Sequence, residues 1–182
     1  MPRYDFAAHP TKWNGIQYRS RLEARWAIFF TALGISFQYE PLLLVREGMR
    51  KLYVPDFYLP GLKCFLEVKP NAPTRKEVAK AQLLSTSCNA PVFISTNDFF
   101  SINSPVSLTF RKVQEGKLVR SSYAFDLCAD CLSLDFLPRE PDATDLLFTA
   151  EESHGLTGYK TDQLDDAFIL ASEYRFTKKE SP

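Results

Sequence analysis

The sequence has 182 residues, 45% hydrophobic and 24% charged, which suits one packed domain with an appendage and argues against bulk disorder. No apolar run approaches the ~18–20 residues of a membrane span, and the N-terminus lacks the apolar stretch of a signal peptide, so we expect a cytoplasmic protein. The zero net charge hides an asymmetry: residues 1–80 hold 13 Lys and Arg against 7 Asp and Glu, and the other 102 hold 9 against 15. Such a split indicates either a basic functional surface or two solvated surfaces of opposite sign.

The N-terminal part predicts an irregular stretch and then an amphipathic helix. Residues 1–18 contain several residues that break helices and strands, namely Pro2, Pro10, Asn14 and Gly15. Ser20 and Glu23 match the capping-box pattern that begins a helix, and Gly34 ends the run. Between them the apolar residues follow helical spacing: Leu22, Trp26, Phe29, Phe30 and Leu33. Glu23 lies just outside this apolar arc, at a plausible rim of an active site.

The middle of the chain predicts three strands, a helix and a further strand. The strands are expected at 35–40 with an extension to 45, near 52–58, and at 63–69. A helix is predicted from Thr74, which begins a second capping-box match, to Ser87, and a buried strand at 91–96. The first three strands are expected to pair antiparallel, and the last to join in parallel by a right-handed crossover. The predicted fold is therefore α/β, a mixed sheet in the order helix, three strands, helix, strand.

The C-terminal part predicts a hairpin, an acidic segment and a last helix. A hairpin is predicted from 106–113 and 117–125, around Glu115-Gly116. Residues 126–170 carry eleven acidic residues against Arg139 and Lys160, and a last amphipathic helix is expected from Asp162 to Tyr174. We accordingly divide the chain into a core of residues 1–125 and an acidic extension of residues 126–182.

Two neighbouring strands bring two carboxylates together. If Gly61 and Leu62 form a two-residue hairpin loop, Asp56 lies opposite Glu67, with Cβ atoms about 4.5–5.5 Å apart. Strand alternation then places Lys69 on the same face as Glu67. A longer loop would shift this register.

Two opposed carboxylates repel each other, and a bound divalent cation would remove that penalty. Few oxygen ligands with open positions suit Mg²⁺, which keeps waters and binds substrate phosphate. Lys69 beside the metal would orient or deprotonate the attacking water and neutralise charge on the phosphorane. The alternative is that Asp56, Glu67 and Lys69 form a charge ladder on a solvated sheet face.

These motifs resemble those of the PD-(D/E)XK nuclease superfamily, which includes restriction endonucleases, Holliday-junction resolvases and mismatch-nicking enzymes. The resemblance covers roughly residues 16–96 and rests on the order and spacing of short motifs. It is closest to small nucleases of phages and mobile elements and to the nuclease subunit of heteromeric transposases. The segments that carry it are 18–27, Tyr39-Glu40-Pro41, 53–57 and Glu67-Val68-Lys69.

The resemblance implies a restriction-endonuclease-like core and assigns roles to the site residues. Asp56, Glu67 and the carbonyl of Val68 would bind Mg²⁺, for which Mn²⁺ is expected to substitute. Lys69 would be the catalytic lysine, and Glu23 would contact the metal directly or through water. For Glu23 there is a structural alternative, because a helix cap and pairing with Arg19 also explain it.

Basic residues in the first part are candidate contacts to DNA phosphates, although they cannot all face one groove: Arg19, Arg21, Arg25, Arg46, Arg50, Lys51, Arg75, Lys76 and Lys80. Gln82 is a further candidate at the edge of the site. For Lys80 and Gln82 the alternative is the polar face of a helix. Tyr18 and Tyr39 are candidates for base stacking, but aromatic residues in this chain more often belong to a core.

Cys128 and Cys131 form half of a zinc knuckle, and the sequence does not supply the other half. The only histidines are His9 and His154, and Cys64 and Cys88 are expected in the core. Since related small nucleases sometimes carry a zinc module after the core, the pair is either a degenerate remnant or two reduced structural cysteines. We do not expect zinc.

Three functions remain open. The leading one is a Mg²⁺-dependent DNA endonuclease, which would act as a monomer or, for double-strand cutting, as a homodimer. The second is a binding or assembly protein that has kept the fold, with the acidic segment docking a basic partner or covering the groove. The third is the cutting or DNA-binding subunit of a larger transposition or recombination complex, active only with partners. RNA as a substrate stays possible.

Overall fold

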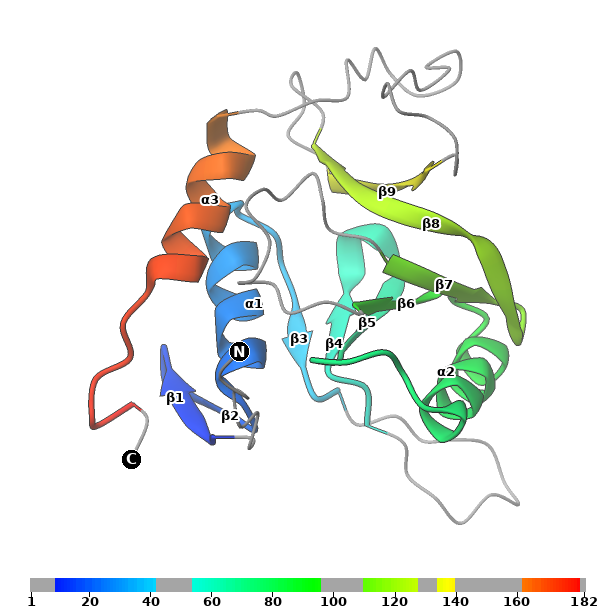
Figure 1. Ribbon diagram of the computed structural model, residues 1–182, viewed down its shortest axis with the longest axis horizontal. Helices are drawn as coiled ribbons and strands as arrows, with labels where there is room; N and C mark the ends of the chain where they lie inside the picture. The colour runs from blue at the N-terminus through cyan, green and yellow to red at the C-terminus, as the bar shows by residue number, and fades with distance from the viewer. Residues whose placement is uncertain (1–8, 42–53, 96–109, 128–133, 140–161, 181–182) are drawn as a thin grey trace, which may run out of the picture.

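The computed structural model describes residues 9–41, 54–95, 110–127, 134–139 and 162–180, and is a mixed α/β structure. Its main sheet has seven strands in the order β3-β4-β5-β6-β7-β8-β9 (Figure 1). The strands are β1 (Thr11–Trp13), β2 (Ile16–Tyr18), β3 (Gln38–Tyr39), β4 (Phe57–Leu59), β5 (Cys64–Val68), β6 (Val92–Ser95), β7 (Phe110–Gln114), β8 (Lys117–Leu127) and β9 (Leu134–Arg139). The helices are α1 (Arg21–Ala32), α2 (Arg75–Cys88) and α3 (Asp162–Glu173).

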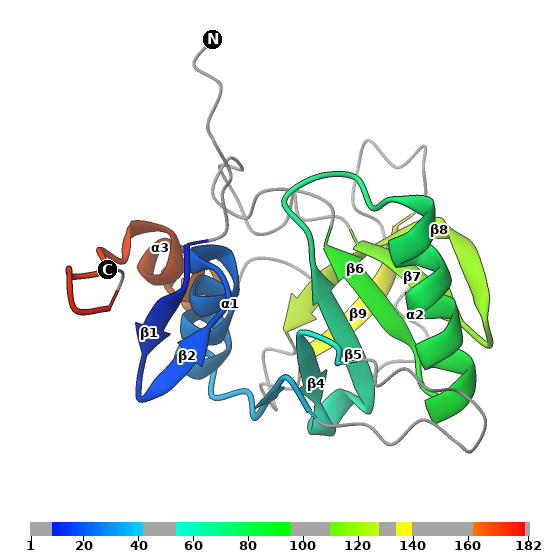
Figure 2. The same ribbon diagram turned by 90° about the horizontal axis from the view of Figure 1, so that it is seen from below.

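Helices cover both faces of this sheet. Side chains of α1 and α3 form one buried cluster with residues of β4, β5 and β6, and side chains of α2 form a second cluster with β5, β6 and β7. Figure 2 shows α1 and α3 on one side of the sheet and α2 on the other. Strand alternation sorts β5 between them: Cys64, Leu66 and Val68 face α1, whereas Phe65 faces α2.

The predicted order of helix, three strands, helix and strand is confirmed. β3 pairs antiparallel with β4, β4 antiparallel with β5, and β5 parallel with β6. The hairpin predicted around Glu115-Gly116 is also confirmed, since β7 and β8 pair antiparallel there and both turn residues have positive φ. Thr74 caps α2 with the complete reciprocal capping box.

The hairpin between β4 and β5 has the predicted register but a different turn. Phe57 pairs with Leu66, Tyr58 with Phe65 and Leu59 with Cys64, as expected. The connection is a 3₁₀ turn (Pro60–Leu62), and the residue in the left-handed region is Lys63, at φ 50°, not Gly61. The two-residue loop was therefore wrong. The register survives because the apolar alternation of both strands fixes which face is buried.

The prediction of irregular structure up to residue 18 is wrong for residues 11–18. β1 and β2 form a separate antiparallel hairpin, joined by Asn14 and Gly15 at φ 47° and 80°. Both turn residues have the positive φ of the two-residue hairpin turn that Asn-Gly favours. We interpreted the dipeptide as a helix and strand breaker and overlooked its specific turn chemistry.

The C-terminal part is joined closely to the rest. β8 crosses the predicted boundary at residue 125, and β9 adds to it antiparallel. α3 begins at the predicted residue and buries Leu164, Ala167, Phe168 and Ala171 in the cluster that contains α1. The division at 125 stays a prediction, but sheet pairing and helix packing both cross it.

Candidate active site

Asp56 and Glu67 lie at the same edge of the sheet. Asp56 immediately precedes β4, and continuing the register of β4 and β5 by one residue sets it opposite Glu67. Both carboxylates are buried, with 3% and 4% of their residue surface exposed. The backbone N–H of Val68 donates to Asp56 Oδ2 at 2.8 Å, which fixes this carboxylate against the end of β5.

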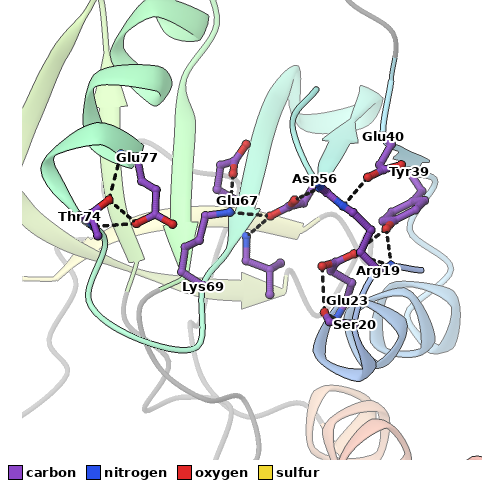
Figure 3. A network of polar contacts seen from close by, with 11 residues as sticks. Arg19, Ser20, Glu23, Tyr39, Glu40, Asp56, Glu67, Lys69, Thr74 and Glu77 are labelled. Atoms are coloured by element: carbon purple, nitrogen blue, oxygen red, sulfur yellow. Dashed lines mark hydrogen bonds and ion pairs between the residues drawn. The ribbon is translucent and has the colours of Figure 1, made fainter. Parts of the chain in front are cut away.

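Lys69 bridges the two carboxylates. Its Nζ lies 2.8 Å from Glu67 Oε2 and 3.1 Å from Asp56 Oδ2 (Figure 3). Its backbone N–H donates to the carbonyl of Ser95, so the lysine is held where β5 and β6 end side by side. Burial lowers the pKa of Lys69, but the charges of Asp56 and Glu67 outweigh that effect and raise it. The ammonium group therefore stays charged and offsets the repulsion between Asp56 and Glu67, which we had expected a bound metal ion to remove.

Arg19 holds the other oxygen of Asp56. Its guanidinium lies 2.7 Å from Asp56 Oδ1 and 2.5 Å from Glu40 Oε1. The backbone N–H of Glu40 also donates to the carbonyl of Asp56, which ties the end of β3 to the start of β4. Arg19 was predicted to contact DNA phosphate. The structure places it on the acids of the site, although 56% of its side chain is exposed.

Glu23 joins this cluster from α1. It is 7% exposed and accepts hydrogen bonds from the Ser20 hydroxyl at 2.8 Å, the Arg19 backbone N–H at 3.1 Å and the Tyr39 hydroxyl at 2.5 Å. Burial raises its pKa above the usual glutamate value, the hydrogen bond from Tyr39 opposes this, and the charge of Asp56 adds to it. Glu23 is therefore both part of the helix cap and a member of the site.

Tyr39 and Glu40 are members of the site whose roles we did not predict. Burial and the adjacent Glu23 raise the pKa of Tyr39, so its hydroxyl stays protonated and can donate. Both residues were noted within the motif of the resemblance, but nothing in local spacing indicates which side chains they reach. Their positions depend on the pairing of β3 with β4.

The donor set fits a partly hydrated Mg²⁺. Among residues 9–41, 54–95, 110–127, 134–139 and 162–180, no group of three or more His, Cys, Asp and Glu side chains is arranged to hold a metal ion. Mg²⁺ does not need such a group, because proteins bind it through one or two carboxylates together with water and substrate phosphate. Asp56 and Glu67 supply two buried carboxylates that already share one cationic group. The ion pairs and hydrogen bonds described above join four acids, Glu23, Glu40, Asp56 and Glu67, to two bases, Arg19 and Lys69.

The predicted phosphate contacts lie on both sides of this site. Arg21 is exposed at the start of α1, and Arg75, Lys76 and Lys80 are exposed on α2. Arg25 has a structural function: its guanidinium donates to the carbonyls of Ala171 and Ser172 and lies 5.6 Å from the ring centre of Phe176. Arg25 thus anchors the end of α3. Arg46, Arg50 and Lys51 lie outside the described residues.

The remaining candidates are placed as follows. Tyr18 is completely buried, as the core interpretation required, and burial raises its pKa to about 12. Gln82 is half-buried on α2. Cys64 is buried in the cluster that contains α1 and Cys88 packs against the second cluster, and neither is in a disulfide. Cys128, Cys131 and His154 lie outside the described residues, so the zinc question is not tested.

Comparisons with protein-family models, with curated proteins and with solved structures found no match to this chain. In the part of the chain that the structure describes, none of the helices has the length and apolar character to cross a membrane.

Proposed function

We propose that this chain is a Mg²⁺-dependent endonuclease with a restriction-endonuclease-like core that hydrolyses DNA phosphodiester bonds. The observation that carries the proposal is the bridging of two buried carboxylates, Asp56 and Glu67, by Lys69 at a sheet edge. Glu23 adds a third buried carboxylate from the facing helix. The resemblance of these motifs to the PD-(D/E)XK pattern supports the same activity.

Asp56, Glu67 and the carbonyl of Val68 would hold Mg²⁺ in this proposal, with Glu23 bound to it directly or through water and Mn²⁺ able to replace it. The metal would supply an activated water and a counter-charge for the phosphate. Lys69 neutralises the negative charge that develops on the phosphorus-bound oxygens.

Arg19 and the basic residues on either side supply the contacts to substrate. Among the described residues, Arg19 is an exposed cation in direct contact with the carboxylates, so it would contact a substrate phosphate that enters the site. Arg21 on α1 and Arg75 and Lys76 on α2 would contact phosphates further along the strand.

Incubation of the purified protein with supercoiled, linear, branched and single-stranded DNA tests the proposal, with Mg²⁺, Mn²⁺ or EDTA in parallel. We expect cutting of at least one substrate with either metal and none in EDTA. If nothing is cut with either metal at high protein concentration, the protein is not an endonuclease on its own.

The substitution Lys69→Ala should lower the cleavage rate by about 100-fold or more, because it removes a preorganised positive charge from the reacting phosphate. Lys117→Ala is the matched control, since Lys117 is an exposed lysine at the start of β8. Equal rates for the two variants would contradict the role of Lys69.

A further inference from the structure

The hydroxyl of Tyr39 lies between the start of α1 and the sheet. It donates to Glu23 Oε2 at 2.5 Å and accepts from the backbone N–H of Arg19 at 2.9 Å (Figure 3). Its donor hydrogen and one of its acceptor lone pairs are therefore used within the site.

The ring of Tyr39 is fixed by the sheet and by its aromatic neighbours. Tyr39 pairs with Phe57 across β3 and β4, and their ring centres are 5.4 Å apart. The buried ring of Tyr18 packs on it, with centres 4.5 Å apart. Because Phe57 follows Asp56 directly in the chain, the position of the Tyr39 ring is tied to the strand that carries Asp56.

The other donors to Glu23 come from the helix start. Ser20 and Arg19 directly precede α1, and both donate to Glu23 from the helix start. Among the described residues whose hydrogen bonds to Glu23 are identified, Tyr39 is the one that belongs to the sheet. Its hydroxyl therefore links the Glu23 carboxylate directly to the sheet edge, beside the ion pair between Arg19 and Asp56.

We propose that Tyr39 is a positioning residue, whose hydroxyl orients the Glu23 carboxylate toward Asp56 for action on the same phosphate. This inference rests on the proposed nuclease function. It replaces the expectation that Tyr39 stacks on a base, because the hydroxyl is committed to Glu23 and the ring to Tyr18 and Phe57.

Cleavage kinetics of Tyr39→Phe, Glu23→Ala and the double variant test this role, with Tyr58→Phe as the matched control. Tyr58 is the neighbouring tyrosine on β4, and its ring packs on Phe65 on the face toward α2. We expect Tyr39→Phe to lower kcat by about 10-fold and to leave the affinity for DNA in EDTA unchanged. In the Glu23→Ala background it should cause no further loss, because its effect passes through Glu23.

Urea unfolding without metal gives a readout that does not depend on activity. The effects of Tyr39→Phe and Glu23→Ala on stability should be non-additive, whereas those of Tyr58→Phe and Glu23→Ala should add.

Five outcomes are decisive. A loss of DNA affinity with unchanged kcat would restore the base-stacking role and overturn the inference. Multiplicative losses in the double variant would also overturn it, as would a wild-type rate in Tyr39→Phe. If the wild type cuts no DNA, the proposed function fails, and additive unfolding effects would separately refute the coupling of Tyr39 to Glu23.

Discussion

The starts of α1 and α2 have the same sequence pattern and different chemistry. Ser20 and Glu23 at one helix, and Thr74 and Glu77 at the other, occupy the N-cap and third helical positions of a capping box. Glu77 is partly exposed and closes the cap of its own helix, accepting from the Thr74 backbone N–H and hydroxyl at 2.7 Å each. Glu23 is buried and also accepts a hydrogen bond from Tyr39 of the sheet (Figure 3).

The pKa values of the two glutamates move in opposite directions. Burial dominates at Glu23 and raises its pKa. At Glu77 burial has the same sign, but the hydrogen bonds from Thr74 outweigh it and lower the pKa. A capping motif therefore does not exclude a functional role. The neighbours that the fold brings to the glutamate decide whether it is only a cap residue or also a member of the site.

Substitutions of Glu23 and Glu77 should differ most in their effect on the cleavage rate. Glu23→Gln is expected to reduce the cleavage rate by about 10- to 100-fold, the range typical of groups that support a metal site. Glu77→Gln should leave the rate close to the wild-type value, because the hydrogen bonds of Glu77 are those of the α2 cap and its charge only adds to the field at Lys69. Single-turnover cleavage of plasmid DNA measures both, and equal losses would remove the distinction between the two helix starts.

Substitutions of the two N-cap residues should lower stability at both helices but slow cleavage at only one of them. Ser20→Ala and Thr74→Ala should each cost about 1 kcal/mol of unfolding free energy, because each removes an acceptor for an N-terminal backbone N–H. Ser20→Ala should also slow cleavage, since the Ser20 hydroxyl donates to Glu23. Urea unfolding and cleavage assays on both variants test this. A slower Thr74→Ala enzyme would show that α2 is also coupled to the site.

The smallest effect is a pH dependence of stability at α2. The folded-state pKa of Glu77 lies below its unfolded value, so its stabilising contribution is present above the unfolded pKa and disappears as pH falls through the folded pKa. Glu77→Gln should have a lower free energy of unfolding than wild type at neutral pH. The two free energies should converge as the pH falls from about 4.3 through the folded-state pKa of Glu77. A difference that persists in acid would mean that the charge of Glu77 does not stabilise the cap.

Local signals in the sequence were sufficient for most of the core. Caps and apolar spacing placed α1, α2 and α3 within one or two residues of their observed ends. The β4–β5 register was predicted from a two-residue loop and is correct although that loop is wrong, and alternation along β5 placed Lys69 on the face of Glu67. These features depend on contacts between residues close in the chain, which patterns report well.

Several side-chain contacts between distant segments were not predicted. Arg25 was assigned to phosphate because a basic residue on a helix carries no mark of its partner, here the end of α3 almost 150 positions away. The bonds from Tyr39 to Glu23 and from Arg19 to Asp56 likewise join different elements. The β1–β2 hairpin differs from these cases, because its Asn-Gly signal was present and was misinterpreted.

The most direct test of the account compares wild type with Asp56→Asn in Mg²⁺-dependent cleavage of supercoiled DNA. Asparagine keeps the shape of the side chain and removes the negative charge with which both Lys69 and Arg19 form ion pairs. We expect the wild type to cut and Asp56→Asn to lose cleavage while still unfolding cooperatively on heating. Cleavage at the wild-type rate by a folded Asp56→Asn protein would contradict the assignment of this site.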